Sequence, residues 1–427
     1  MSTLALLGGK PVIDRELSPY RTIGEEERAA VDRVMQTGQL SGYVGAWCDA
    51  FDGGPEVRKF EAAWAECFEA SHAVAVNSNT SGLMAAVGAA GVSPGDEVIL
   101  PPYTMSATAM APLIYGGVPV FVDIEPETYC LDPRLVREAI TPRTRAIIVV
   151  NLFGHPAALH ELRELADEKG IVLIEDNAQG PLASENGRYA GTIGHIGVFS
   201  LNYHKHFHTG EGGVCTTDDD DLVLRMRLIR NHGENVVEPL HIADATNLIG
   251  FNFRLTELSA AIGTEQLKKA KPLVARREAI ALRVSDAVRG LPGLTPPMVR
   301  EGCRHVFYHW GARYDEAVTG VSRDTVVKAL AAEGAPVWQG YVAPLYLLPA
   351  FQRRLAIGRD GFPFNLSEQR YDHGLCPVAE RYHERELLEL AVCSYELDDA
   401  DVDAVIAAFD KVFSNLSALS NLAGDQA

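Results

Sequence analysis

The sequence lacks the features that would place a protein in a membrane, outside the cell or on nucleic acid. No stretch approaches the roughly 18 uninterrupted apolar residues of a transmembrane helix, and the N-terminus has neither the basic start nor the length of a signal peptide. The seven cysteines are odd in number and form no Cys-x-x-Cys pair, so neither a disulfide framework nor a zinc site is indicated. The formal net charge of -19 argues against nucleic-acid binding. We therefore expect a cytoplasmic protein without a metal, a membrane segment or a nucleic-acid partner.

What the sequence does contain is enough apolar material for a large core. Its 427 residues are 47% hydrophobic, which predicts more than one structural unit. Between residues 72 and 217, short apolar runs alternate with helical patterns, which indicates an α/β fold with a mainly parallel sheet covered by helices. The expected strands are 97–100, 119–122, 146–150, 172–175 and 197–201. We expect an N-terminal arm (1–24), a large domain (25–266) that begins with a helix at 25–37, and a C-terminal part (267–427) that consists of a long interdomain helix at 267–290 and a smaller α+β domain.

The most informative residue is Lys205, which lies among three histidines between a β-like run and the glycine turn 210–213. A buried lysine near other cations has a lowered pKa and suits imine formation. The alternative is a surface lysine, as most lysines are. His204, His206 and His208 are compatible with loop histidines bonded to the backbone, whereas His206 or His208 in a ligand site would meet substrate hydroxyls or phosphate.

An acidic partner for this amine follows the strand expected at 172–175. Glu175 and Asp176 end the apolar run, and ligands of open α/β sheets bind at the carboxyl ends of strands. Pyridoxal phosphate needs an imine-forming lysine, a phosphate cradle and an acid that keeps its ring nitrogen protonated. Asp176 is our candidate for that acid, and a helix N-cap is the alternative interpretation.

A candidate phosphate cradle lies further upstream. A β-like run passes into Asn79-Thr80-Ser81-Gly82 and then into an alanine-rich helical stretch, so hydroxyls and backbone N–H groups meet at a helix N-terminus. Such an end binds phosphate, although an ordinary Ser/Thr N-cap would have the same sequence. Cradle, acid and lysine in this order are together much more specific than any one of them.

These motifs resemble the DegT/StrS-type sugar aminotransferases from about residue 20 to about residue 410. The segments that carry the resemblance are NSNTSG (77–82), GDEVI (95–99), EDNAQ (175–179), FS (199–200), Lys205 and TGEGG (209–213). The resemblance implies a pyridoxal 5'-phosphate enzyme of the aspartate-aminotransferase fold (fold type I), with pyridoxamine 5'-phosphate formed during turnover. It also implies amino transfer from glutamate or glutamine to a keto-sugar, nucleotide-linked for preference, or a keto-cyclitol, in cell-surface glycan or secondary-metabolite biosynthesis.

The resemblance also implies roles for individual residues. Lys205 would form the imine with the cofactor and later move the proton between substrate and cofactor carbons. Asp176 would pair with the pyridine nitrogen, and Gln179 would lie against the ring near its phenolic oxygen. The phosphate would be held by three hydroxyl residues, Thr80, Ser81 and Ser200.

A further match concerns assembly. Asn252 corresponds to the asparagine that reaches the phosphate of the neighbouring subunit's cofactor, which implies a homodimer with shared active sites. Without the resemblance, we would interpret Asn252 as a loop-capping amide. Tyr341 and Tyr346 lie where relatives approach the substrate, so they are candidate substrate contacts.

Two positions depart from the family pattern. Relatives commonly stack an aromatic residue on the cofactor ring where this chain has Met105, whose thioether can also cover a ring face. Tyr103 is an alternative ring neighbour. Asn79 stands where relatives usually have glycine, which suggests a less permissive backbone at the phosphate turn.

Lys205 also separates two kinds of chemistry. A branch of the family replaces this lysine with histidine and uses pyridoxamine phosphate to dehydrate deoxysugars. The lysine therefore favours transamination, with a dehydratase as the alternative. A third hypothesis is a binding or regulatory protein that keeps the fold without the chemistry, and the presence of both Lys205 and Asp176 argues against it.

Overall fold

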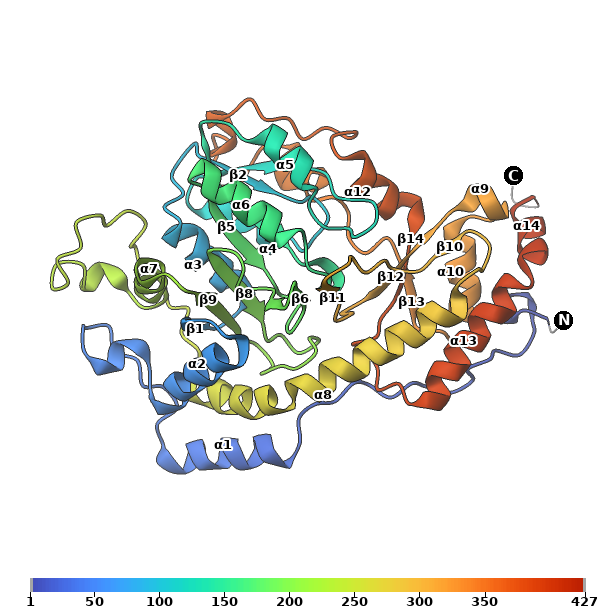
Figure 1. The fold of residues 1–427 in the computed structure, drawn as a ribbon, viewed down its shortest axis with the longest axis horizontal. Coiled ribbons are helices and arrows are strands. Elements are labelled where there is room, and N and C mark those ends of the chain that lie inside the picture. The colour runs from blue at the N-terminus through green and yellow to red at the C-terminus, as the bar shows by residue number, and fades with distance from the viewer. Residues whose placement is uncertain (1–2, 425–427) are drawn as a thin grey trace.

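The computed structural model describes residues 3–424 and is built around a seven-stranded sheet (Figure 1). Only β9 runs antiparallel to both of its neighbours, and the remaining strand pairs are parallel. This confirms the mainly parallel α/β fold expected from the sequence. The strands in spatial order are β1 (His72–Val76), β9 (Gly213–Thr217), β8 (Ile196–Ser200), β5 (Val172–Asp176), β4 (Thr144–Val150), β2 (Glu97–Leu100) and β3 (Val118–Phe121).

Helices cover this sheet because its strands are apolar on both faces. The strands β2 and β3 are buried at every residue, as expected for a sheet enclosed by helices. The covering helices are α2 (Pro55–Phe68), α3 (Asn79–Ala89), α4 (Ala107–Ile114), α5 (Pro133–Ala139), α6 (Leu159–Lys169) and α7 (Asp220–Arg230). The N-cap of α3 is Ser78, whose hydroxyl accepts the N–H of Ser81, so the predicted phosphate turn does begin a helix.

One long helix, α8 (Glu257–Val288), joins the two halves of the molecule. It begins after Thr256, whose hydroxyl accepts the N–H of Ser259. Its first half packs against α1 (Glu25–Thr37) and α2, and the helix α13 (Asp399–Phe413) also packs against it. Figure 1 shows α8 running from below the large sheet to the smaller one. The boundary expected at residues 266 and 267 therefore lies inside a continuous helix.

The smaller domain has its own sheet and core. Its strands in spatial order are β10 (Leu294–Thr295), β12 (Trp310–Tyr314), β14 (Leu387–Leu390) and β13 (Val337–Gln339). Trp310 lies in this core with residues of α10 (Arg323–Ala332) and α13. Leu4, Ile13 and Leu17 pack into the same core, so the N-terminal arm belongs structurally to this domain.

Part of the C-terminal half packs on the large domain instead. Tyr346, Phe351 and Tyr371 belong to the larger core, and Asp123 accepts the N–H groups of Val378 and Ala379. The expected C-terminal domain is therefore not one separate block. The remaining short elements are α9 (Glu316–Thr319), α11 (Pro349–Gln352), α12 (Pro377–Arg381), α14 (Leu416–Gly424), β6 (Ser184–Glu185), β7 (Arg188–Tyr189) and β11 (Cys303–Arg304).

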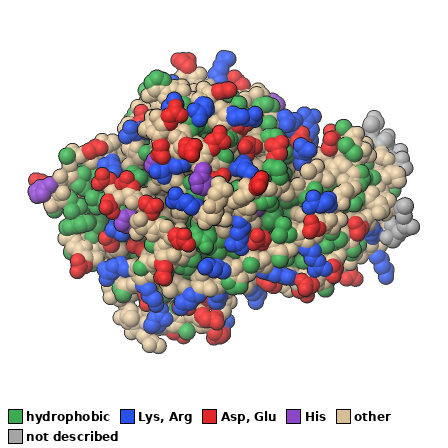
Figure 2. All heavy atoms as spheres, viewed as in Figure 1, with side chains coloured by type: hydrophobic (Ala, Val, Ile, Leu, Met, Phe, Trp, Pro, Cys, Tyr) green, Lys and Arg blue, Asp and Glu red, His purple; other side chains and the backbone are tan. Residues whose placement is uncertain are grey.

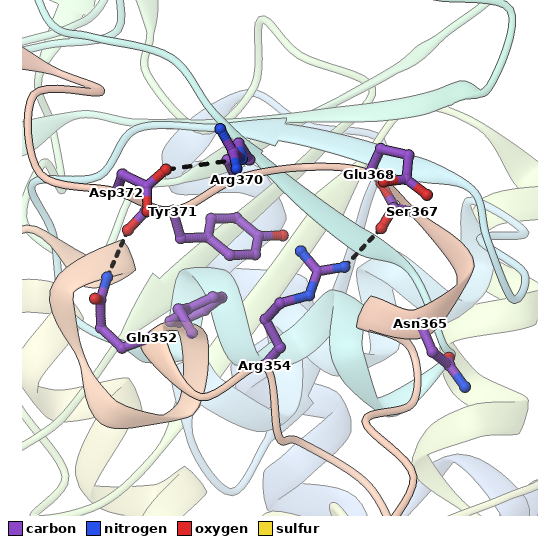
Figure 3. Close-up of a pocket in the computed structure, with 9 residues that line it drawn as sticks. Gln352, Arg354, Asn365, Ser367, Glu368, Arg370, Tyr371 and Asp372 are labelled. Atoms are coloured by element: carbon purple, nitrogen blue, oxygen red, sulfur yellow. Dashed lines mark hydrogen bonds and ion pairs between the residues drawn. The ribbon is translucent and has the colours of Figure 1, made fainter.

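A surface cavity of about 430 Å³ lies in this segment (Figure 3). Its central cation, Arg354, donates to the backbone carbonyls of Phe364, Ser367 and Gln369. Because these carbonyls engage the guanidinium, Arg354 serves to fix the loop. None of the cofactor residues expected from the sequence lines this cavity.

On the face drawn in Figure 2, acidic and basic side chains are interspersed. Among the described residues, no helix is long and apolar enough to cross a bilayer.

Candidate active site

A second cavity, of about 340 Å³, lies at the carboxyl ends of the parallel strands. Asp176 ends β5 and Ser200 ends β8, while Thr80 lies in the first turn of α3, the helix that follows β1. The fold thus brings together residues that are far apart in the sequence, at the sheet edge where ligands of α/β proteins bind. The residues expected from the sequence that line this cavity are Thr80, Met105, Asp176, Gln179, Ser200, Lys205 and Tyr341.

Lys205 lies in the loop after β8 and is only 8% exposed. Its burial lowers the pKa of the amine from 10.5 to about 8, although the negative charge of Asp176 acts in the opposite direction. The Nζ atom lies 4.2 Å from the ring centroid of Tyr308, which reaches the cavity from the C-terminal half. A lysine held in this way is partly neutral near physiological pH, as a nucleophilic amine requires.

The environment of Lys205 predicts the pH dependence of the rate at which the protein without cofactor reacts with added pyridoxal phosphate. Because the neutral amine is the nucleophile, the capture rate should rise with pH through about 8 and then level off. Stopped-flow absorbance from pH 6 to 11 would measure this profile. In Asp176→Asn the midpoint should move lower, since Asp176 raises the pKa of Lys205. A wild-type rate that still rises steeply above pH 10 would contradict the lowered pKa.

Asp176 is buried and held by three donors. The Thr108 hydroxyl donates to Oδ2 at 2.8 Å, and the Asn79 side chain donates to Oδ1 at 3.2 Å. The N–H of Ala178 also donates to Oδ1, at 3.3 Å. Burial raises the pKa of Asp176, whereas these donors and Lys205 lower it. Sequence reasoning missed Thr108, because nothing in the sequence pairs α4 with the end of β5.

Gln179 and Tyr341 form one wall of the cavity. The Gln179 Oε1 atom accepts the N–H of Phe153 at 2.6 Å, and its Nε2 donates to the Tyr341 hydroxyl at 2.8 Å. Tyr341 has a left-handed backbone (φ 42°), and its N–H donates to the buried carboxylate of Glu389 at 2.8 Å. Tyr341 is thus anchored both to the loop after β5 and to the smaller sheet.

The expected phosphate residues separate into two groups. Thr80 and Ser200 line the cavity. Ser81 is buried behind the turn, where its hydroxyl donates to Asn77 Oδ1 at 2.6 Å. Asn252 is exposed and does not line the cavity of its own chain.

Met105 and the histidines also have distinct positions. Met105 lines the cavity and is 61% exposed, whereas Tyr103 is fully buried outside the lining. His204 lines the cavity, and burial together with Lys205 lowers its pKa to about 4. His206 does not line it, because its ring is buried and its Nε2 donates to the carbonyl of Val306 at 2.9 Å. His208 lies outside as well, and its Nδ1 accepts the N–H of Gly210.

Buried histidines make the fold sensitive to acid. Burial lowers the pKa of His206 to about 3 and that of His155 to about 4, and His305 is shifted in the same direction. Because the folded state disfavours the protonated forms of these histidines, the free energy of unfolding should be highest above pH 6.5 and should fall as the pH drops toward 4. For His206 alone the loss is about 3 kcal/mol.

Urea denaturation between pH 8 and 4 would measure this loss. In His206→Gln the acid limb should be shallower, because glutamine can still donate to Val306 and does not titrate. Identical acid limbs in the variant and the wild type would exclude His206 as a contributor.

The cavity fits pyridoxal phosphate. Lys205 offers an amine for the aldehyde, Asp176 an acid for the ring nitrogen, and Thr80 and Ser200 hydroxyls beside the N-terminus of α3 for the phosphate. The fold and the site together define a pyridoxal-phosphate-dependent enzyme.

Comparison with known proteins agrees. Residues 21–410 match the DegT/DnrJ/EryC1/StrS aminotransferase family. The L-glutamine:2-deoxy-scyllo-inosose aminotransferase of Streptoalloteichus tenebrarius is 35% identical over 96% of this chain and 97% of its own. The GDP-perosamine synthase of Caulobacter vibrioides is 33% identical over 83% of this chain and 89% of its own.

A solved structure leads to the same family. The chain matches S. venezuelae DesV in complex with a ketimine intermediate with a TM-score of 0.77 and 32% identity, over 91% of this chain and 94% of that one. The chain therefore belongs to the DegT/DnrJ/EryC1/StrS aminotransferase family, as its motifs predicted, and is a pyridoxal-phosphate-dependent aminotransferase.

Proposed function

We propose that this enzyme transfers an amino group from glutamine or glutamate to an uncharged keto-cyclitol or keto-sugar. The observation that carries the proposal is the charge of the cavity. Among the described residues that line it, Lys205 is the one lysine or arginine, and the acids Asp176 and Glu211 line it as well. A neutral polyol ketone suits such a lining, which has hydroxyl, amide and aromatic groups for hydrogen bonds and stacking.

The residues around the cavity would divide the chemistry. Bound pyridoxal phosphate supplies an electron sink that stabilises negative charge on the substrate carbon. The Lys205 amine, once released from the cofactor, would move the proton between the substrate and cofactor carbons. Asp176 would hold the ring nitrogen in its protonated form, and Thr80 and Ser200 would bind the phosphate.

A nucleotide-linked keto-sugar is the second candidate substrate, supported by the similarity to the GDP-perosamine synthase. Its diphosphate would require cations beyond Lys205, from residues that do not line this cavity. We further propose a homodimer in which the exposed Asn252 reaches the partner's cofactor. Crosslinking and light scattering would test the dimer, and Asn252→Ala should weaken cofactor binding if the sites are shared.

A substrate panel would test the proposed activity. The pyridoxamine form of the enzyme is mixed with free cyclitol ketones, free keto-sugars and nucleotide-linked keto-sugars, and the return of the pyridoxal spectrum is recorded. A faster return with an uncharged ketone supports our proposal, whereas a return with nucleotide-linked sugars alone overturns it. Loss of a substrate hydroxyl without return of the spectrum would identify a dehydratase. Glutamine and glutamate are then compared as donors for the reverse half-reaction.

A further inference from the structure

We infer that Asn79 is a positioning residue for Asp176, through which it tunes the binding of the cofactor's ring nitrogen. Asn79 is the first residue of α3, in the turn after β1, whereas Asp176 ends β5. The two side chains meet across the floor of the cavity, with Nδ2 of Asn79 3.2 Å from Oδ1 of Asp176. The inference rests on the role proposed above for Asp176.

The geometry determines which edge of the Asn79 amide faces the acid. Its Oδ1 atom would repel an ionised carboxylate, so the Nδ2 edge must face Asp176. Its own Oδ1 is buried and has no hydrogen-bond partner among the described residues. An unpaired buried acceptor is unfavourable. The side chain of Asn79 is therefore held in this position by the bond that its Nδ2 donates to Asp176.

That hydrogen bond acts on the charged form of the acid. Asp176 is 4% exposed, and burial favours its neutral form, which cannot pair with a protonated ring nitrogen. Donors to a carboxylate favour the ionised form. Thr108 supplies one donor on Oδ2, and Asn79 supplies the side-chain donor on Oδ1. Asn79 therefore helps to keep Asp176 ionised and aimed into the cavity.

The test must separate this role from a simple contribution to the phosphate turn. We would measure the dissociation constants of pyridoxal phosphate and of 1-deazapyridoxal phosphate, in which a C–H group replaces the ring nitrogen. The protein without cofactor is used as wild type, Asn79→Ala and Asn79→Gly. The two variants both lack the amide donor and differ in backbone freedom, so a shared effect reports the donor.

We expect both variants to bind pyridoxal phosphate about tenfold more weakly, which is typical for loss of a hydrogen bond to a charged group. Binding of the deaza analogue should be unchanged, because it presents no ring nitrogen to Asp176. In an Asp176→Asn background the Asn79 effect should disappear. Asn365→Ala, at an exposed residue that does not line this cavity, serves as the control.

The other outcomes overturn the inference. An equal loss for both ligands would place the effect of Asn79 in the phosphate turn, and no loss for either would remove it from the site. A loss in Asn79→Gly alone would assign the effect to the backbone. If Asp176→Asn binds both ligands as the wild type does, the proposed role of Asp176 itself fails, and this result is distinguishable from a failure at Asn79.

Discussion

Replacing Lys205 with alanine is expected to lower the rate of amino transfer by about 10²- to 10⁴-fold, the usual range for loss of a general acid–base group. The visible absorption that follows reaction of wild-type protein with pyridoxal phosphate should also be absent. The physical reason is that Lys205 is the one amine in the described cavity lining and has a pKa lowered to about 8 by burial. Single-turnover kinetics and absorbance spectra would measure both effects.

Two variants serve as controls for this prediction. Lys205→Arg keeps a positive charge but cannot lose its proton, so it should be as inactive as the alanine variant. Lys268→Ala removes an exposed lysine of α8 and should leave the rate unchanged. Addition of a small primary amine should partly restore activity to Lys205→Ala only. Wild-type turnover in Lys205→Ala would exclude the proposed chemistry.

The second large effect is expected at the end of β5, where two neighbouring carboxylates should respond differently to replacement by an amide. Glu175 is fully buried on the opposite side of the strand from Asp176, and it accepts the N–H groups of Gly191, Ile193 and Gly194. We expect Glu175→Gln to lower the free energy of unfolding by about 3 kcal/mol, because an amide turned toward these donors leaves part of them unpaired. Urea denaturation of the protein without cofactor would measure the change.

Asp176→Asn should behave differently. Asp176 accepts one backbone N–H, that of Ala178, whereas Glu175 accepts three, and a neutral amide also removes a buried charge, so the loss of stability should be much smaller than in Glu175→Gln. Cofactor affinity and turnover should fall instead. A stable Glu175→Gln with weakened cofactor binding, beside an unstable Asp176→Asn, would reverse our assignment of the two residues.

Local sequence patterns predicted much of the fold. The expected strand 97–100 and helix 25–37 agree with β2 and α1, because strand alternation, apolar runs and helix periodicity are local properties. The long helix was expected at 267–290 but begins ten residues earlier, at Glu257. The helix starts where the Thr256 hydroxyl caps it. Our expectation rested instead on the point where the sequence becomes strongly charged, which lies further along the chain.

The site was predictable only where its residues end strands or follow them in short motifs. Lys205, Asp176 and Thr80 line one cavity, as the order of the motifs suggested. The approach of Tyr308 to Lys205 depends on how the two halves pack, and no local pattern encodes that packing. The sequence marked Asn79 as unusual, but its contact with Asp176 spans 97 positions and follows from the sheet order.

The continuous helix α8 has a consequence for how the molecule unfolds. At 1.5 Å per residue, its 32 residues extend about 48 Å. Ala270 and Val274 belong to the larger core, and Ile280 and Val284 belong to the smaller one. If either core unfolded alone, apolar residues of α8 would be exposed while the other core still held the rest of this helix. The two domains should therefore lose their structure in a single calorimetric transition, despite having separate sheets.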